Sequence, residues 1–94
     1  MNKRQRKKNE KRGMWKDAYN LDYALAKWLV PHLKLFLKLN IANPWDMTFE
    51  EWQATVQEIH DGLEDYVKNG FDADLESTQR SMWLIGKHFG DLWI

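Results

Sequence analysis

The stretch NLDYALAKWLVPHLKLFLKLN, residues 20–40, decides the fold because it is the most apolar run of the chain. Apolar side chains recur along it every three or four residues, as they do on one side of an α-helix. Two such series are present. The first is Leu21, Leu25, Trp28, Leu29, His32, Phe36 and Leu39, and the second is Ala26, Val30, Leu33 and Leu37. Packing against one neighbour requires only one series, so the stretch predicts a central helix or a helix that also meets another subunit.

Pro31 lies inside this predicted helix. A proline there removes one backbone hydrogen bond and clashes with the carbonyl four residues earlier. We therefore expect a kink near residues 28–30, or a break into two shorter helices. The simpler interpretation is a bend that wraps the helix around the core. The alternative is that the freed carbonyl of Lys27 faces a binding site.

The next helix is predicted over residues 49–69. Thr48 and Glu51 have the spacing of a capping box, and Gly70 is a natural C-terminal end. The apolar residues of this helix follow a narrow 3-4 spacing that suits one neighbouring helix. The opposite face is acidic, with Glu50, Glu51, Glu58, Asp61, Glu64 and Asp65. That face is either exposed to solvent, a mimic of nucleic-acid charge, or a dock for the basic N-terminus.

The last helix begins near Asp72 or Asp74, since aspartate is a favoured N-cap. Gly86 and Gly90 are four residues apart, and this spacing suggests that another backbone comes close there. Trp45 lies in the loop IANPWDM, residues 41–47, which precedes the helix predicted over residues 49–69. It either covers the core or is an exposed anchor, and we expect the first.

These patterns predict an all-α fold, a three-helix bundle with a kinked first helix and a basic N-terminal arm. The chain of 94 residues is expected to form one helical domain over residues 14–94, preceded by the arm at residues 1–13. Residues 14–19 would be an apolar lead-in that lies on the bundle. The arm has no apolar residue after Met1, so it would be either mobile or a helical extension.

Charge is unevenly distributed although the formal net charge is zero. Residues 1–16 hold eight Lys and Arg against one Glu, and residues 46–76 hold ten Asp and Glu against one Lys. The two blocks could attract each other within or between chains. Residues 3–12 could also contact nucleic acid through its phosphates.

Reaction chemistry is not indicated, so we do not expect an enzyme. The chain has no cysteine, no glycine-rich phosphate loop and no nucleophile elbow. The three histidines fall one in each predicted helix without a paired ligand spacing, so neither a metal nor a cofactor is predicted. No run is long and apolar enough to cross a membrane, so no membrane span is expected. The absence of cysteine fits a reducing cytoplasm.

A binding site is better supported than a catalytic one. Aromatic rings stack on nucleotide bases, and Lys or Arg meets phosphates. The candidate ligand-binding residues that combine these groups are Trp15, Lys16, Tyr19, Tyr23, Lys27, Trp28, Arg80 and Lys87. The alternative is that Tyr23 and Trp28 belong to the core while their lysines extend to water. Six tryptophans are many for so small a core, which predicts that some of them meet a partner and that the protein is a homo-oligomer.

Three segments, NLDYALAKWLVPHLKLF, MTFEEWQ and GKHFGDLW, resemble a group of small uncharacterised proteins encoded by tailed bacteriophages. The resemblance covers residues 15–94. It implies an accessory protein in the host cytoplasm that counters host defence, either by sequestering a signalling nucleotide or by binding a defence protein.

We take nucleotide sequestration as the first hypothesis. The second is an inhibitor that binds a host defence protein through its acidic helix and exposed tryptophans. The third is a nucleic-acid-binding accessory protein that uses the basic arm.

Overall fold

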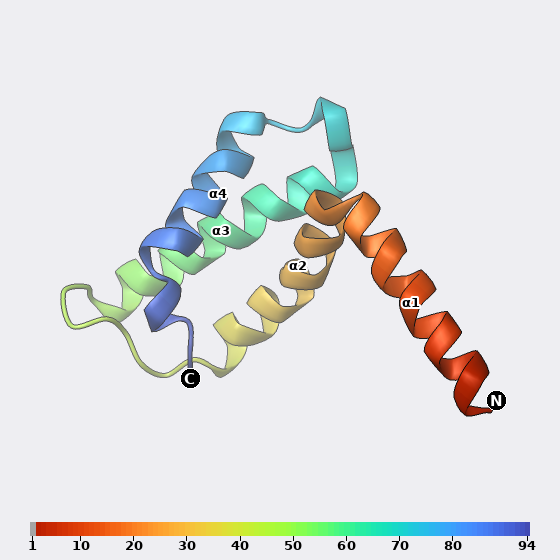
Figure 1. Cartoon of the computed structure of the whole chain (residues 1–94). Coiled ribbons are helices and arrows are strands. Elements are labelled where there is room, and N and C mark those ends of the chain that lie inside the picture. Colours follow the sequence, from red (N-terminus) through yellow and green to blue (C-terminus); the bar gives the residue numbers. More distant parts are fainter. Residues whose placement is uncertain (1) are drawn as a thin grey trace.

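The computed structural model describes the backbone of residues 2–94 and the side chains of residues 2–5 and 13–94. Its described residues are helical and include no strand, so the predicted all-α class is confirmed. The order of the elements (Figure 1) is α1 Lys3–Tyr19, α2 Leu21–Leu39, α3 Phe49–Asn69, the 3₁₀ turn η1 Gly70–Asp72, α4 Leu75–Lys87 and the 3₁₀ turn η2 Phe89–Asp91. None of these helices has the length and apolar character that a membrane span requires, as far as the described residues go.

Helix α3 is the centre of the molecule, because both α2 and α4 pack against it (Figure 1). It supplies most of the core, with Trp52, Val56, Ile59 and Leu63 almost completely removed from solvent. The prediction that residues 20–40 form the central helix is therefore wrong. The narrow apolar series of α3 serves two neighbours, because its buried side chains also line the crossing with α4.

Helix α2 packs mainly through its second apolar series. Ala26 and Leu33 are buried, and Val30 and Leu37 are half-buried against the core. The first series is divided: its Leu29 and Phe36 also pack on the core. Its other apolar members are exposed, and these are Leu21, Leu25, Trp28 and Leu39. One side of α2 is thus covered by its own chain and the other is open.

Pro31 does not divide α2, which continues as one helix from Leu21 to Leu39. The predicted alternative of two shorter helices is therefore wrong. One turn of backbone near the proline gains a side-chain partner, since Nδ1 of His32 lies 2.5 Å from the carbonyl oxygen of Trp28. The N–H that Pro31 lacks would have bonded to the carbonyl of Lys27, so the His32 contact with Trp28 does not replace it.

The ends of α3 follow the sequence signals. The Thr48 side chain accepts a hydrogen bond from the Glu51 N–H, and the Glu51 side chain accepts one from the Thr48 N–H. Gly70 ends the helix with φ of 53°, a left-handed conformation that favours glycine. Asp74 caps α4 by accepting hydrogen bonds from the backbone of Glu76 and Ser77.

Gly62 is the glycine at which two helices meet. A Cβ at Gly62 would lie 2.1 Å from Ser81 Oγ and 2.7 Å from the Ser77 carbonyl oxygen of α4. A Cβ at Gly86 or Gly90 would meet nothing within 4 Å. Within one chain, the close backbone approach is therefore at Gly62 and not at Gly86 or Gly90.

Helix α1 projects from the rest of the molecule and touches it near the start of α2 (Figure 1). Residues 3–12 are helical, which agrees with a helical extension rather than a mobile arm, and α1 runs through Gly13 without interruption. Met14, Trp15 and Tyr19 are exposed, so the lead-in does not lie on the bundle as predicted. Trp45 does not cover the core either, because 97% of its surface is exposed.

Candidate functional site

The predicted aromatic residues at the end of α1 and the start of α2 are on the surface. Trp15 and Tyr19, one turn apart on α1, stack with their ring centres 5.7 Å apart, and Lys16 beside them is exposed. On α2, the Lys27 ammonium lies 5.9 Å from the ring centre of Tyr23. The core alternative for Tyr23 is thereby excluded, since 42% of that side chain is exposed.

Trp28 is likewise a surface residue. Its ring stacks on His32 with the ring centres 3.8 Å apart, and 59% of the residue is exposed. Trp28 lines an open hollow of about 410 Å³ together with Asp17 of α1 and, from α2, Leu21, Ala24, Leu25 and Lys27. We call residues 14–28, which contain this hollow and the turn between the two helices, the elbow.

The predicted phosphate ligands Arg80 and Lys87 lie elsewhere, on α4. Their charged groups flank Trp83: the guanidinium carbon is 5.8 Å and the ammonium nitrogen 5.1 Å from its ring centre. Arg80 is also paired with Glu58 of α3 at 2.8 Å. Helix α4 packs on α3 and away from α1, so the structure places the eight candidate residues in two separate groups.

A groove between α3 and α4 has a volume of about 600 Å³. Its polar lining is dominated by carboxylates, with Arg80 as its one cation. The lining residues are Ala54, Gln57, Glu58, Asp61, Gly62 and Asp65 of α3, and Asp74, Ser77 and Arg80 at the cap and first turns of α4. We call this concavity the acidic groove.

Two groove carboxylates are held in the ionised form. His60 and Gln57 donate hydrogen bonds to Asp61 and lower the pKa of its carboxyl group. The Asp74 backbone N–H, followed by the Asn69 side chain, lowers the pKa of Asp65. A general acid needs a raised pKa near neutrality, so these groups are suited to attracting cations rather than to donating protons.

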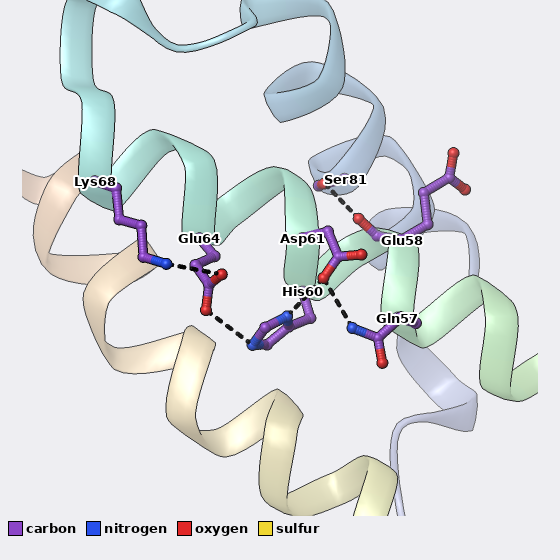
Figure 2. A network of polar contacts seen from close by, with 7 residues as sticks. All are labelled: Gln57, Glu58, His60, Asp61, Glu64, Lys68 and Ser81. Atoms are coloured by element: carbon purple, nitrogen blue, oxygen red, sulfur yellow. Dashed lines mark hydrogen bonds and ion pairs between the residues drawn. The ribbon is translucent and has the colours of Figure 1, made fainter.

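The Asp61 carboxylate belongs to a chain of polar contacts along α3 (Figure 2). His60, which is buried, has Nδ1 3.0 Å from Asp61 and Nε2 3.6 Å from Glu64, and Glu64 accepts a hydrogen bond from Lys68 at 3.2 Å. On the α4 side, the Ser81 hydroxyl donates to the Glu58 carbonyl oxygen. Of the side chains in these contacts, Gln57 and Asp61 line the groove, and their hydrogen bond joins them on its α3 wall.

The sequence analysis identified the acidic residues that line the groove, but it did not identify α4 as the helix that forms the other wall. Glu58, Asp61 and Asp65 were recognised as one acidic face of the helix. Their arrangement around a concavity depends on α4 crossing at Gly62, and the glycine spacing drew attention to Gly86 instead. The role of Trp83 between two cations was also missed, although residues 80, 83 and 87 have helical spacing.

Two further sequence predictions concern metal ligands and a contact with nucleic acid. In the part of the chain that the structure describes, no three His, Asp or Glu side chains gather as metal ligands would. The nucleic-acid contact expected of residues 3–12 falls largely on side chains outside the described residues; Lys3 and Arg4, which are described, are exposed.

Compared with known proteins, the chain matches no family model, no curated protein and no solved structure.

Proposed function

We propose that the protein is a non-enzymatic binding protein whose acidic groove holds a basic segment of a partner protein. The observation that carries this proposal is the groove of about 600 Å³, around which Glu58, Asp61, Asp65 and Asp74 outnumber a single Arg80. Clefts lined by one sign of charge concentrate the opposite charge and speed association. A segment with two or three Lys or Arg side chains fits such a field.

The wall of the groove supports binding more than chemistry. The pKa values of Asp61 and Asp65 are lowered, so both carboxylates are charged at neutral pH and available to cations. Trp83 stands on α4 beside Arg80 and offers a flat apolar surface next to the charged one. Aromatic residues next to polar rims are common anchors of protein interfaces.

The resemblance to small tailed-phage proteins gives this proposal its setting, which is the cytoplasm of an infected bacterium. The partner would then be a host protein, and binding it would inhibit a defence response. The resemblance alone supports that setting.

The test is binding of fluorescent ten-residue peptides to the full chain, measured by anisotropy at two salt concentrations. A Lys/Arg-rich peptide is expected to bind, and its affinity should fall as salt rises because surface charge is screened. An Asp/Glu-rich peptide should not bind. Failure of every basic peptide to bind at low salt would refute the proposal.

A charge-matched pair of variants locates the binding. The double variant Glu58→Gln/Asp61→Asn removes two groove charges, and Asp46→Asn/Glu50→Gln removes two charges outside the groove. We expect the first to weaken binding of the basic peptide at least tenfold and the second to leave it within about twofold. Equal losses in both variants would mean that net charge, rather than the groove, attracts the peptide.

Nucleotide sequestration is the second candidate, and the hollow at the elbow favours it. Its volume of about 410 Å³ lies within the range of small-ligand pockets, and Lys27 and Trp28 supply one cation and one stacking surface. Lys16 would be a further phosphate ligand, whereas Arg80 and Lys87 are on α4.

Calorimetry with cyclic di- and trinucleotides tests this second candidate. Trp28→Ala should abolish the heat of binding and Trp83→Ala should preserve it. If none of these nucleotides gives a heat of binding, nucleotide sequestration is refuted.

A further inference from the structure

The elbow exposes a concentration of apolar side chains on both sides of the turn between α1 and α2. Seven large apolar side chains between residues 14 and 28 are exposed, and they are Met14, Trp15, Tyr19, Leu21, Tyr23, Leu25 and Trp28. The chain itself leaves them open because α1 projects away from α3 and α4 (Figure 1). Exposed apolar surface that is concentrated in one place marks an interaction site.

The size of this surface matches what a stable pair of proteins needs. The exposed fractions of its four aromatic residues are 71% for Trp15, 75% for Tyr19, 42% for Tyr23 and 59% for Trp28. With about 150–250 Å² for each fully exposed aromatic side chain, these four alone offer about 500 Å². The three aliphatic side chains add to that, and a standard interface buries about 800 Å² on each partner.

The elbow carries both an exposed aromatic pair and a hollow, the two features that a two-fold pairing requires. The stacked pair Trp15 and Tyr19 protrudes from α1, and the hollow lined by Leu21, Leu25 and Trp28 lies across the turn. A two-fold symmetric interface needs a protrusion and a recess on the same chain, because each copy then supplies both. The hollow also holds one acidic and one basic residue, Asp17 and Lys27, so a second copy meets no net charge there.

The stability of α1 gives an independent argument for a second copy. Its 17 residues include Gly13 and contact only the start of α2. An isolated helix of this length is marginal in water, and helices in proteins owe most of their stability to packing. The chain also has a basic first helix and an acidic remainder with zero net charge overall, so no net charge repulsion opposes the pairing of two copies.

We propose that two copies of the chain form a two-fold symmetric dimer through the elbow, in which the Trp15–Tyr19 pair of each copy fills the hollow of the other. This interface is separate from the acidic groove, so the two proposals stand or fall independently. It also competes with nucleotide binding, since the same hollow cannot hold both.

Sedimentation equilibrium of the full chain without added nucleotide tests the pairing. The wild type is expected to have the mass of a dimer at high micromolar concentration and to dissociate on dilution. Trp15→Glu/Trp28→Glu should be a monomer whose circular dichroism spectrum loses no more helical signal than the 17 residues of α1 contribute. Trp45→Glu, at an exposed loop tryptophan outside the elbow, should remain a dimer. A wild type that is monomeric at every concentration, or a Trp45→Glu variant that alone dissociates, would overturn the proposal.

The absence of native cysteine allows a second test that does not depend on losing the dimer. Lys16→Cys places a thiol beside the Trp15–Tyr19 pair and keeps both rings, and Ala24→Cys places one in the hollow. Mixing the two variants with a short bismaleimide should give a cross-linked heterodimer, and mixing Trp45→Cys with Ala24→Cys should not. Equal cross-linking in both mixtures would show that the contact is random, and cross-linking in neither would exclude this docking geometry.

Discussion

Gly62 is the residue on which the α3–α4 crossing depends. Alanine there would put a methyl group 2.7 Å from the Ser77 carbonyl oxygen, and backbone cannot rotate away as the Ser81 hydroxyl can. We expect Gly62→Ala to lower the free energy of unfolding by about 1–3 kcal/mol. Urea unfolding followed by circular dichroism measures this change.

Gly86→Ala is the matched control, because the same methyl group meets nothing within 4 Å in α4. Alanine favours helix over glycine, so this variant should be up to about 1 kcal/mol more stable than the wild type. Similar losses in both variants would show that α4 does not approach α3 as closely as described.

The hydrogen bond from the Tyr66 hydroxyl to Asp22 ties α3 to α2. It lowers the pKa of Asp22 below its ordinary 3.8 and raises the pKa of Tyr66 above its ordinary 10.0. The stabilisation from Asp22 is therefore full above pH 3.8 and is lost as pH falls through the lowered pKa. The stabilisation from Tyr66 is full below pH 10.0 and is lost as pH rises through the raised pKa.

Tyr66→Phe removes this bond and leaves the ring. We expect the variant to melt at a lower temperature than the wild type between about pH 4 and pH 10, with the difference shrinking outside that window. Thermal melts across the pH range measure the difference. A difference that stays constant to pH 2, or that grows there, would contradict the assignment.

At the scale of elements, the ends of helices were the features that the sequence predicted best. Thr48, Glu51 and Gly70 act through local contacts within a few residues, so their spacing alone specifies the geometry.

The capping box of α3 gives a direct prediction. Thr48→Ala should cost about 1 kcal/mol of unfolding free energy, and Thr48→Ser, which keeps the hydroxyl, should cost less than half of that. Equal losses in denaturant titrations would mean that the cap contributes nothing.

The position of an element in the fold was predicted less well, because it depends on distant parts of the chain. Residues 20–40 are more apolar than α3, yet only Ala26 and Leu33 of α2 are buried. Apolar content cannot distinguish a helix covered on two sides from one that keeps a bare side. For the same reason, the sequence around Trp45 could not show whether this side chain covers the core or is exposed.

For the molecule as a whole, the sequence predicted the components of the candidate sites but not how they are grouped. Acidic residues on one helix face and tryptophans in excess were both evident. The groove needs α4 to cross at Gly62, and the separation of Arg80 and Lys87 from Trp15 and Trp28 needs α1 to project. Both are tertiary arrangements that helical spacing does not encode.

The chain leaves the apolar side chains of the elbow uncovered, and our central claim is that a second copy covers them. Backbone hydrogen exchange of the full chain at two concentrations tests that claim most directly, because exchange reports local opening along the chain. We predict that amides of residues 14–28 exchange more slowly at high concentration than at low, while those of the α3 core, residues 52–63, exchange equally slowly at both. Exchange at residues 14–28 that is the same at both concentrations would contradict the claim.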